Sequence, residues 1–234
     1  WLAGGSAVSN TDGTITSSVS ANPEAGVSIM AYTGNGSSSQ TVGHGLGAVS
    51  SPSMLIVKNR DQNDNWIVRT NATGEDKFLF LNDVSSGGTS SVALPTTDVI
   101  GLGSSGYDNA SGEDYVAYLF SNVDGFSKCG SYSGNGNANG TFIFTGFRPA
   151  WVMIKRTDAS ADWWILDNKR NSSNVVDLRL RPNSSSAEEG PDATFDFVAS
   201  GLKIRGNYST LNNSSGTYIY LAIGEQAGKY SNAR

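Results

Sequence analysis

The sequence is poor in the residue types that most often carry catalysis and metal binding. Its 234 residues include one cysteine, one histidine and six prolines, and 16% of them are charged. The single cysteine, Cys129, excludes an intrachain disulfide framework and a cysteine-rich zinc site, and we expect it to be a small buried hydrophobic residue. A catalytic serine–histidine–aspartate arrangement would have to use His44, because the chain has no other imidazole.

Long apolar runs and clusters of positive charge are also missing. The apolar runs are far shorter than the roughly 18 residues that a membrane-spanning helix needs. No stretch is rich in lysine or arginine, and the net charge is −5. We therefore expect neither membrane insertion nor a nucleic-acid partner.

Glycine, serine, threonine and asparagine fill much of the chain, and aromatic residues, at 10%, recur between them. Apolar runs such as Val27–Tyr32, Ser53–Lys58 and Trp151–Lys155 are separated by glycine-, serine- and asparagine-rich turns, which is typical of short strands. No stretch long enough to form a helix has apolar residues at i, i+3, i+4 and i+7, so we expect little helix. The sequence predicts an all-β chain with antiparallel β-sandwich or jelly-roll packing.

The two parts of the chain carry the same three anchors in the same order. The first is the pattern Tyr-Thr/Ser-Gly-Asn-Gly, at residues 32–36 and again 100 residues later at residues 132–136. The second is a lysine that ends an apolar strand and is followed eight residues later by a tryptophan, and the third is a tyrosine in a closing strand. The matched residues are Tyr32 and Tyr132, Lys58 and Lys155, Trp66 and Trp163, and Tyr115 and Tyr218. We therefore predict two tandem, similar β units.

The repeat also predicts the domain organisation. We expect a strand end and connector at residues 1–26, with weak strand character near Ile15. A first β repeat would follow at residues 27–127, and a second β repeat with a C-terminal tail at residues 128–234.

One segment of the second repeat alternates apolar and charged residues without interruption. The pattern predicts a half-solvated antiparallel strand at Val176–Arg181. The inward residues would be Val176, Leu178 and Leu180, and the outward residues would be Asp177, Arg179 and Arg181.

Candidate catalytic groups are scarce, and none lies in a motif that we recognise as catalytic. His44 lies in Gly43-His-Gly-Leu-Gly between strands, and the second repeat has no histidine there, so we interpret this site as a structural corner. Glycoside hydrolysis needs two carboxylates about 5–10 Å apart. The adjacent Glu188 and Glu189 lie in a serine-rich loop that we expect to be solvated. We predict no catalytic residue, although aspartates at strand ends could still pair across the fold.

Three acidic and amide-rich loops could supply oxygen ligands for calcium, at residues 61–64, 108–114 and 158–162. None matches a calcium-loop pattern, and asparagine and aspartate are ordinary turn residues. We therefore predict turns at these places, with no metal site and no cofactor.

Aromatic residues are the remaining candidates for a binding site. Trp66 and Trp163 share a position of the repeat, and we expect both in the core. Because adjacent strand residues point to opposite faces, Trp164 would lie on the other face, between sheets or exposed. An exposed tryptophan can stack on a sugar ring or fill a subunit interface, so packing and glycan contact both stay open. The candidate ligand-binding residues are Trp164 and, in the preceding turn, Asp158 and Asp162.

These motifs resemble the repeat units of a family of phage tail proteins found among marine and cyanobacterial phages. The resemblance rests first on Gly43-His-Gly-Leu-Gly followed by an apolar strand that ends in Lys58. It rests also on Gly130-Ser-Tyr-Ser-Gly-Asn-Gly leading to Thr145-Gly-Phe-Arg-Pro-Ala-Trp-Val-Met-Ile-Lys-Arg-Thr-Asp. The opening Trp1-Leu-Ala-Gly-Gly and Trp163-Trp-Ile-Leu-Asp match the same pattern, whereas residues 224–234 depart from the endings typical of the family.

The resemblance implies a virion structural protein, at a tail fibre or similar appendage rather than on the capsid. It implies partner copies of the same chain, as the homotrimer common among long β appendages, and other virion proteins. A glycan of the host cell surface is the expected ligand, because rigid strands can hold adaptable polar loops against sugars. Two alternatives stay open: a capsid decoration or fibre-shaft protein without a ligand, and a polysaccharide depolymerase.

Overall fold

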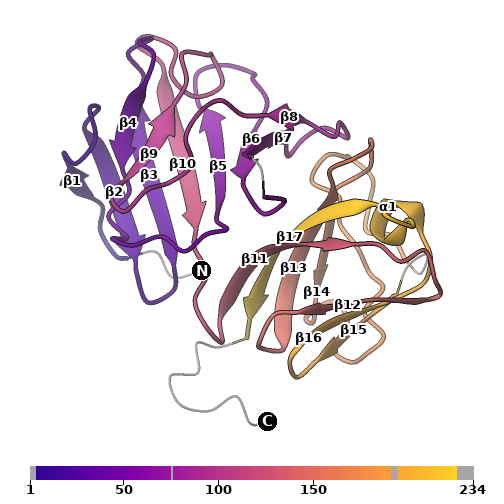
Figure 1. Cartoon of the computed structure of the whole chain (residues 1–234). Helices are drawn as coiled ribbons and strands as arrows, with labels where there is room; N and C mark the ends of the chain where they lie inside the picture. Colours follow the sequence, from indigo (N-terminus) through magenta and orange to yellow (C-terminus); the bar gives the residue numbers. More distant parts are fainter. Residues whose placement is uncertain (1–3, 75, 191–193, 226–234) are drawn as a thin grey trace. The chain divides into compact units, whose positions relative to one another are not determined.

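The computed structural model describes residues 4–74, 76–190 and 194–225, and these form an all-β chain of antiparallel sheets, as predicted (Figure 1). The helical content of the described residues is one short helix, α1 (Ser209–Asn212). The chain forms two compact units. Unit 1 consists of residues 1–81 and 87–122, and unit 2 consists of residues 82–86 and 123–234.

Unit 1 contains a long antiparallel sheet and a two-stranded one. The strand order of the long sheet is β1-β2-β3-β10-β5-β6-β7-β8, and β4 pairs with β9. The strands are β1 (Val8–Asn10), β2 (Ser17–Asn22), β3 (Val27–Thr33), β4 (Gln40–Gly43), β5 (Met54–Asn59), β6 (Ile67–Thr70), β7 (Lys77–Phe80), β8 (Gly88–Thr89), β9 (Val99–Leu102) and β10 (Asp114–Phe120). Val42 of β4 and Ile100 of β9 belong to the same core as Leu55 and Ala117 of the long sheet, so the core lies between the sheets.

Unit 2 is built from a four-stranded and a three-stranded sheet. Their strand orders are β11-β17-β13-β14 and β12-β16-β15. The strands are β11 (Ser127–Ser133), β12 (Asn139–Phe144), β13 (Pro149–Arg156), β14 (Trp164–Asp167), β15 (Thr194–Val198), β16 (Gly201–Arg205) and β17 (Thr217–Gly224). Ile143 and Leu202 of the smaller sheet share a core with Val152 and Tyr220 of the larger one.

The predicted connector at residues 1–26 contributes two strands. β1 and β2 extend the long sheet next to β3, and Val19 of β2 is buried because alternate residues of this strand face the core. Between the two strands, Ile15 forms a parallel bridge to Val42 of β4. Residues 13–17 therefore cover one edge of β4, and we call them the edge segment. Residues 1–3 of the predicted strand end lie outside the described residues.

The repeated tyrosines form the same stacked pair in both units. The ring centroids of Tyr32 and Tyr115 are 5.3 Å apart, and those of Tyr132 and Tyr218 are 4.8 Å apart. The interplanar angles are 13° and 9°, so each pair is stacked nearly in parallel. The repeated tyrosines are thus core contacts between the first and the last strand of each repeat.

Residues 82–86 lie within the first repeat of the sequence but belong to unit 2. The backbone carbonyl of Val84 accepts hydrogen bonds from the Ala161 N–H (2.9 Å) and from Lys155 Nζ (3.1 Å). Lys155 is buried, and burial lowers its pKa to about 8. The local sequence pattern does not predict that residues 82–86 belong to unit 2, because this assignment depends on contacts with distant residues.

The segment Val176–Arg181 is not the regular strand that its alternation predicts. It makes isolated bridges to three different places, at Phe195, Ile165 and Glu189. Arg179 is buried at 5% exposure and Leu180 is exposed at 41%, which reverses the predicted sides of these two residues. The Arg179 guanidinium can be buried because it lies 4.3 Å from the ring centroid of Trp164 and pairs with Glu189 at 2.6 Å.

The two repeated tryptophans differ in burial. Trp163 is fully buried, as predicted. Trp66, in contrast, is only half-buried and stacks on Tyr118, with ring centroids 6.5 Å apart. Shared position in the repeat therefore does not guarantee shared burial.

Candidate functional site

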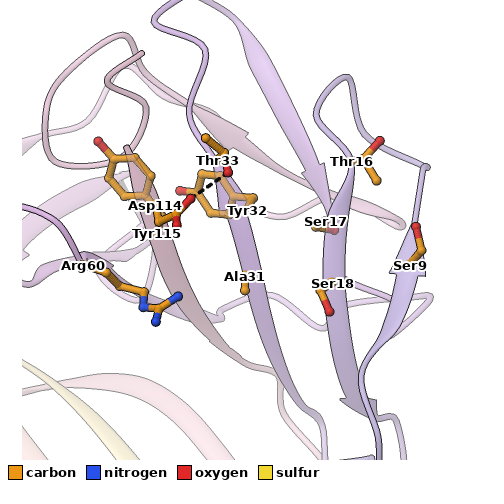
Figure 2. A pocket seen from close by; sticks show the side chains of 10 residues that line it. All are labelled: Ser9, Thr16, Ser17, Ser18, Ala31, Tyr32, Thr33, Arg60, Asp114 and Tyr115. Carbon is orange, nitrogen blue, oxygen red and sulfur yellow. Dashed lines mark hydrogen bonds between the residues drawn. The ribbon is translucent and has the colours of Figure 1, made fainter. Parts of the chain in front are cut away.

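An open polar cleft of about 410 Å³ lies on unit 1 (Figure 2). Its lining comes from β1, β2 and β3, from the start of β10 and from the turn after β5. Hydroxyl groups, one carboxylate and one guanidinium project from these elements. The cleft is the best candidate for a binding site because it gathers several kinds of hydrogen-bonding group on a rigid sheet.

Strand register brings the hydroxyls of the cleft together. Ser9 of β1 is opposite Ser18 of β2, and Ser18 is opposite Ala31 of β3. These residues share the outer face of the sheet, since side chains alternate along each strand and the neighbouring Val19 and Met30 are buried. The small side chain of Ala31 lies between the hydroxyls and the charged side of the cleft, as Figure 2 shows.

The charged side of the cleft holds Asp114 and Arg60. Asp114 is opposite Thr33 in the β3–β10 ladder, and the Thr33 hydroxyl donates a 2.7 Å hydrogen bond to its Oδ1. The backbone N–H of Arg60 donates to the Asp114 carbonyl at 2.8 Å, which fixes the main chain there. The Arg60 side chain is exposed, and its guanidinium has no hydrogen bond or ion pair among the described residues. It is therefore available to a carboxylate or to sugar hydroxyls.

Buried tyrosines support the floor of the cleft. The Tyr32 hydroxyl donates to the Asp108 carbonyl at 2.8 Å, and the Tyr115 hydroxyl donates to the Gly106 carbonyl at 2.8 Å. Burial raises the pKa of Tyr115 to about 12 and that of Tyr32 further still. Both phenols stay neutral at ordinary pH, so their role here is to hold β3 and β10 in place.

The polar groups of the cleft are specific to unit 1. A structural aspartate is shared: it accepts a hydrogen bond from the backbone N–H that starts the last strand, at 2.6 Å in unit 1 and 3.2 Å in unit 2. The residues beside this aspartate differ, because unit 2 has threonines at the positions of Arg60 and Asp114. The aligned residues are Asp61 with Asp158, Arg60 with Thr157, and Asp114 with Thr217.

The structure places Trp164, the first predicted ligand-binding residue, in the core of unit 2. Its side chain is 4% exposed, and its ring lies against the Arg179 guanidinium. This arrangement agrees with the packing interpretation of Trp164 and leaves no open ring face for a sugar to stack on.

The two predicted aspartates are engaged by neighbouring side chains. Asp158 forms a 2.8 Å ion pair with Arg156, whose hydrogen bonds hold the pKa of this carboxyl below its usual value. Asp162 accepts hydrogen bonds from Arg181 and Asn183, both at 2.7 Å. Burial acts to raise the pKa of Asp162, but these hydrogen bonds outweigh burial and leave it lowered. The predicted trio thus does not gather into one open site.

His44 occupies a structural corner, as interpreted from the sequence. Its ring is buried, Nδ1 accepts the Leu46 N–H at 3.1 Å, and Nε2 lies 3.3 Å from the Thr96 carbonyl. Nε2 must therefore carry the proton of the neutral ring. With both nitrogens bound to the main chain, the imidazole has no free atom for proton transfer.

The glutamates that were expected to be solvated are only partly so. Glu188 forms a 3.3 Å ion pair with Arg170, and Glu189 pairs with Arg179 and Arg181. In the part of the chain that the structure describes, no three histidine, cysteine, aspartate or glutamate side chains are placed to hold a metal ion. None of the described helical residues form a helix long and apolar enough to cross a membrane.

Sequence reasoning missed the residues of the cleft. Ser9, Ser18, Thr33, Arg60 and Asp114 are ordinary polar residues scattered over more than a hundred positions. The available signal was a difference between the repeats: a charged pair stands in the first one where the second has threonines.

A family model described as a domain of unknown function (DUF7483) matches residues 1–227 of the chain. Neither the curated proteins nor the solved structures include a match.

Proposed function

We propose that this chain, which belongs to the DUF7483 family, is a virion structural protein of the tail-fibre type that contacts the host cell surface. The proposal combines the resemblance to phage tail repeats with the polar cleft of unit 1. In this interpretation the cleft binds a surface glycan, and the rest of the chain is a rigid scaffold that presents it.

The cleft carries the proposal because its groups suit a sugar. Hydroxyls of Ser9, Ser18 and Thr33 can exchange hydrogen bonds with sugar hydroxyls, while Arg60 offers a planar set of donors. All of them project from strands or from a turn held by backbone hydrogen bonds, so little side-chain and loop ordering is required on binding. Single contacts of this kind are weak, and several copies on one particle would supply avidity.

The difference between the repeats supports the same assignment. Residues shared by the two units, such as the stacked tyrosines, hold the fold. Arg60 and Asp114 are exposed, have threonines at their places in unit 2, and are not required by the repeated fold. Exposed polar residues that the fold does not need are the ones expected to bind a ligand.

Binding is favoured over hydrolysis at this site. Glycosidases of the usual kind use two carboxyl groups across the scissile bond. The cleft is lined by one carboxylate, Asp114, and that carboxylate already accepts a hydrogen bond from Thr33. The neighbouring acid, Asp61, is not part of the lining and is bound to the Asp114 backbone N–H, so it is not placed as a second catalytic acid in the cleft.

The test is binding of the full chain to host envelopes and to the surface polysaccharide purified from them. Arg60→Ala should weaken binding at least about tenfold, since a charge-assisted hydrogen bond contributes about 1.5–3 kcal/mol. Lys169→Ala is the matched control: it removes one positive charge from unit 2, where the side chain is 82% exposed. It should leave binding unchanged.

Three results would count against the proposal. Absence of binding by the wild-type chain would favour a capsid decoration or fibre-shaft protein without a ligand. Release of oligosaccharides from the polymer would favour a depolymerase. Equal loss of binding in both variants would show general charge attraction rather than recognition in the cleft. Gold-labelled antibody on intact particles locates the chain independently, with label at appendage tips as the expected result.

A further inference from the structure

Strand β12 of unit 2 is an edge strand with an exposed aromatic surface. It pairs only with β16 on one side of its three-stranded sheet (Figure 1). Phe142 and Phe144 project from its outer face and are 45% and 64% exposed, whereas Ile143 between them is buried in the core. Exposed aromatic side chains on an unpaired strand edge are a recognised surface for association with another chain.

Unit 1 covers the equivalent edge with its own chain. There β4 pairs with β9 as β12 pairs with β16, and the edge segment lies along the free side of β4. The Ile15 N–H donates to the Thr41 carbonyl at 3.0 Å, and the Thr41 N–H donates to the Thr14 hydroxyl at 2.8 Å. The Ser17 hydroxyl donates to the Gly43 carbonyl at 3.1 Å. This edge of the repeated unit thus accepts an extended segment.

Unit 2 has different residues at these positions and, in its described part, no extended segment along them: the Phe144 carbonyl accepts one long hydrogen bond, at 3.5 Å, from the Tyr220 hydroxyl. The β-ladders align Thr41 with Phe142, Val42 with Ile143, and Gly43 with Phe144. A side chain at Gly43 would collide with Asn10, which shows how closely the N-terminal residues lie over β4. Among residues 4–74, 76–190 and 194–225, no backbone hydrogen bond from another segment reaches Phe142 on the free side of β12.

We propose that β12 is an interface between two copies of this chain, which pair their β12 strands antiparallel around a twofold axis at Ile143. In this register Phe142 of each copy is directly opposite Phe144 of the other. The backbone groups of Phe142, which correspond to those that Thr41 offers to the edge segment, would bond to the second copy. The two three-stranded sheets would become one continuous sheet of six strands.

The neighbouring residues make this edge self-complementary. Within one copy, Phe142 is paired with Lys203 of β16 and Phe144 is paired with Gly201. Across the proposed interface, four side-chain positions would therefore lie in one line: Lys203 and Phe142 of one copy, then Phe144 and Gly201 of the other. The two aromatic rings would meet at the centre, and the Phe142 ring lies over Gly201, which has no side chain to displace it. Lys203 Nζ donates back to the Gly140 carbonyl, and Arg205 pairs with Asp196, so no unpaired like charges face each other at the seam.

Sedimentation velocity of the full chain over a concentration series tests the proposal. The wild-type chain should show a concentration-dependent doubling of mass. Phe144→Lys should abolish the doubling, because a charge on a strand edge opposes pairing. Phe142→Thr, which restores the residue type of unit 1, should weaken it. Val8→Lys is the control, because Val8 is 65% exposed on another edge strand, β1.

Cysteine cross-linking tests the register. A mixture of Phe142→Cys and Phe144→Cys chains should form a disulfide-linked dimer under mild oxidation, and neither variant alone should do so, since directly opposed residues lie within disulfide reach. The native Cys129 is buried and should not interfere. A wild-type chain that stays monomeric, a dimer or trimer unaffected by Phe144→Lys, or equal cross-linking of the single variants would overturn the proposal.

Discussion

Arg69 of unit 1 and Leu166 of unit 2 occupy the same position of the repeated fold. Arg69 is opposite Leu55 in the β5–β6 ladder, and Leu166 is opposite Val152 in the β13–β14 ladder. Both side chains are buried, but Arg69 forms an ion pair with the buried Asp108. The position of Asp108 is taken in unit 2 by Leu211, whose carbonyl accepts the equivalent tyrosine hydroxyl. One unit therefore buries a charged pair where the other buries two leucines.

The first prediction concerns this buried pair. Arg69→Leu and Asp108→Leu should each lower the free energy of unfolding of unit 1 by about 3–5 kcal/mol, because each leaves one buried charge without a partner. The double variant should lose less than either single variant, since both charges are gone and unit 2 already accommodates leucines here. Urea unfolding in a double-mutant cycle measures the coupling, and additive losses would contradict the prediction.

The burial of Arg69 gives a reason for this expectation. Burial lowers the pKa of its guanidinium to about 10, and Nε has no hydrogen-bond partner among the described residues. Nη1 does donate to the Gly101 carbonyl at 2.9 Å. The interactions of the pair therefore do not fully offset the cost of removing its charges from water. In such cases, replacing both partners by apolar residues often leaves the stability unchanged or raises it.

The second prediction concerns a buried asparagine found in each unit. The Asn109 side-chain amide donates to the carbonyls of Ser37 (2.7 Å) and Gly103 (3.0 Å), and its oxygen accepts from the Asn35 N–H (2.9 Å). In unit 2, Asn212 makes the equivalent bonds with Asn137, Gly206 and Asn135. Aspartate would place a carboxylate against the carbonyls, so Asn109→Asp should cost more than about 2 kcal/mol.

Asn212→Asp should have a similar effect on unit 2, and Asn137→Asp, at an exposed residue, is the control. Chemical unfolding followed by tryptophan fluorescence measures the losses. A loss of stability no larger than that of the control would show that the asparagine side chains do not hold these turns.

The third prediction concerns the pH dependence of stability. Burial lowers the pKa of His44 below the usual 6.5 of a histidine, although the Thr96 carbonyl and the charges of Asp98 and Asp12 act in the opposite direction. Below pH 6.5, His44 is therefore protonated more readily in the unfolded chain than in the folded chain. The contribution of His44 to stability should be complete above pH 6.5 and should decline as the pH falls toward the lowered folded pKa.

His44→Asn isolates this effect, because the asparagine oxygen can accept the Leu46 N–H as Nδ1 does and the side chain does not titrate. Free energies of unfolding at pH 8 and pH 5 should differ more for the wild-type chain than for the variant. An equal difference in the two chains would assign the pH dependence to the carboxylates instead.

The fourth prediction concerns Trp164. Because the side chain is buried over Arg179, Trp164→Ala should lower the stability of unit 2 by about 3–5 kcal/mol. Trp164→Phe should be much milder, since it keeps a ring and removes an indole N–H that has no partner among the described residues. Thermal unfolding measures both, and a fully stable alanine variant would contradict the packing role.

Local sequence patterns were sufficient to predict the fold class and the repeated framework. Alternating short runs, glycine-rich turns and the absence of helical periodicity predicted the sheets, since these are local properties of the backbone. The repeated tyrosines were also recognisable in the sequence, because both repeats form the same stacked pair and therefore have tyrosine at the same positions. The apolar run at Ser53–Lys58 likewise predicted a strand, and the structure buries most of that strand, β5, on both faces.

Contacts between residues that are distant in the sequence could be read only from the folded structure. Strand order and register place Ser9, Thr33 and Asp114 around one cleft, although no local pattern links them. Whether a charged side chain can be buried also depends on its partners. Arg179 is buried because its guanidinium lies over the Trp164 ring and forms an ion pair with Glu189. The free edge of β12 likewise follows from the sheet order, because pairing between strands is a long-range contact that residue periodicity does not encode.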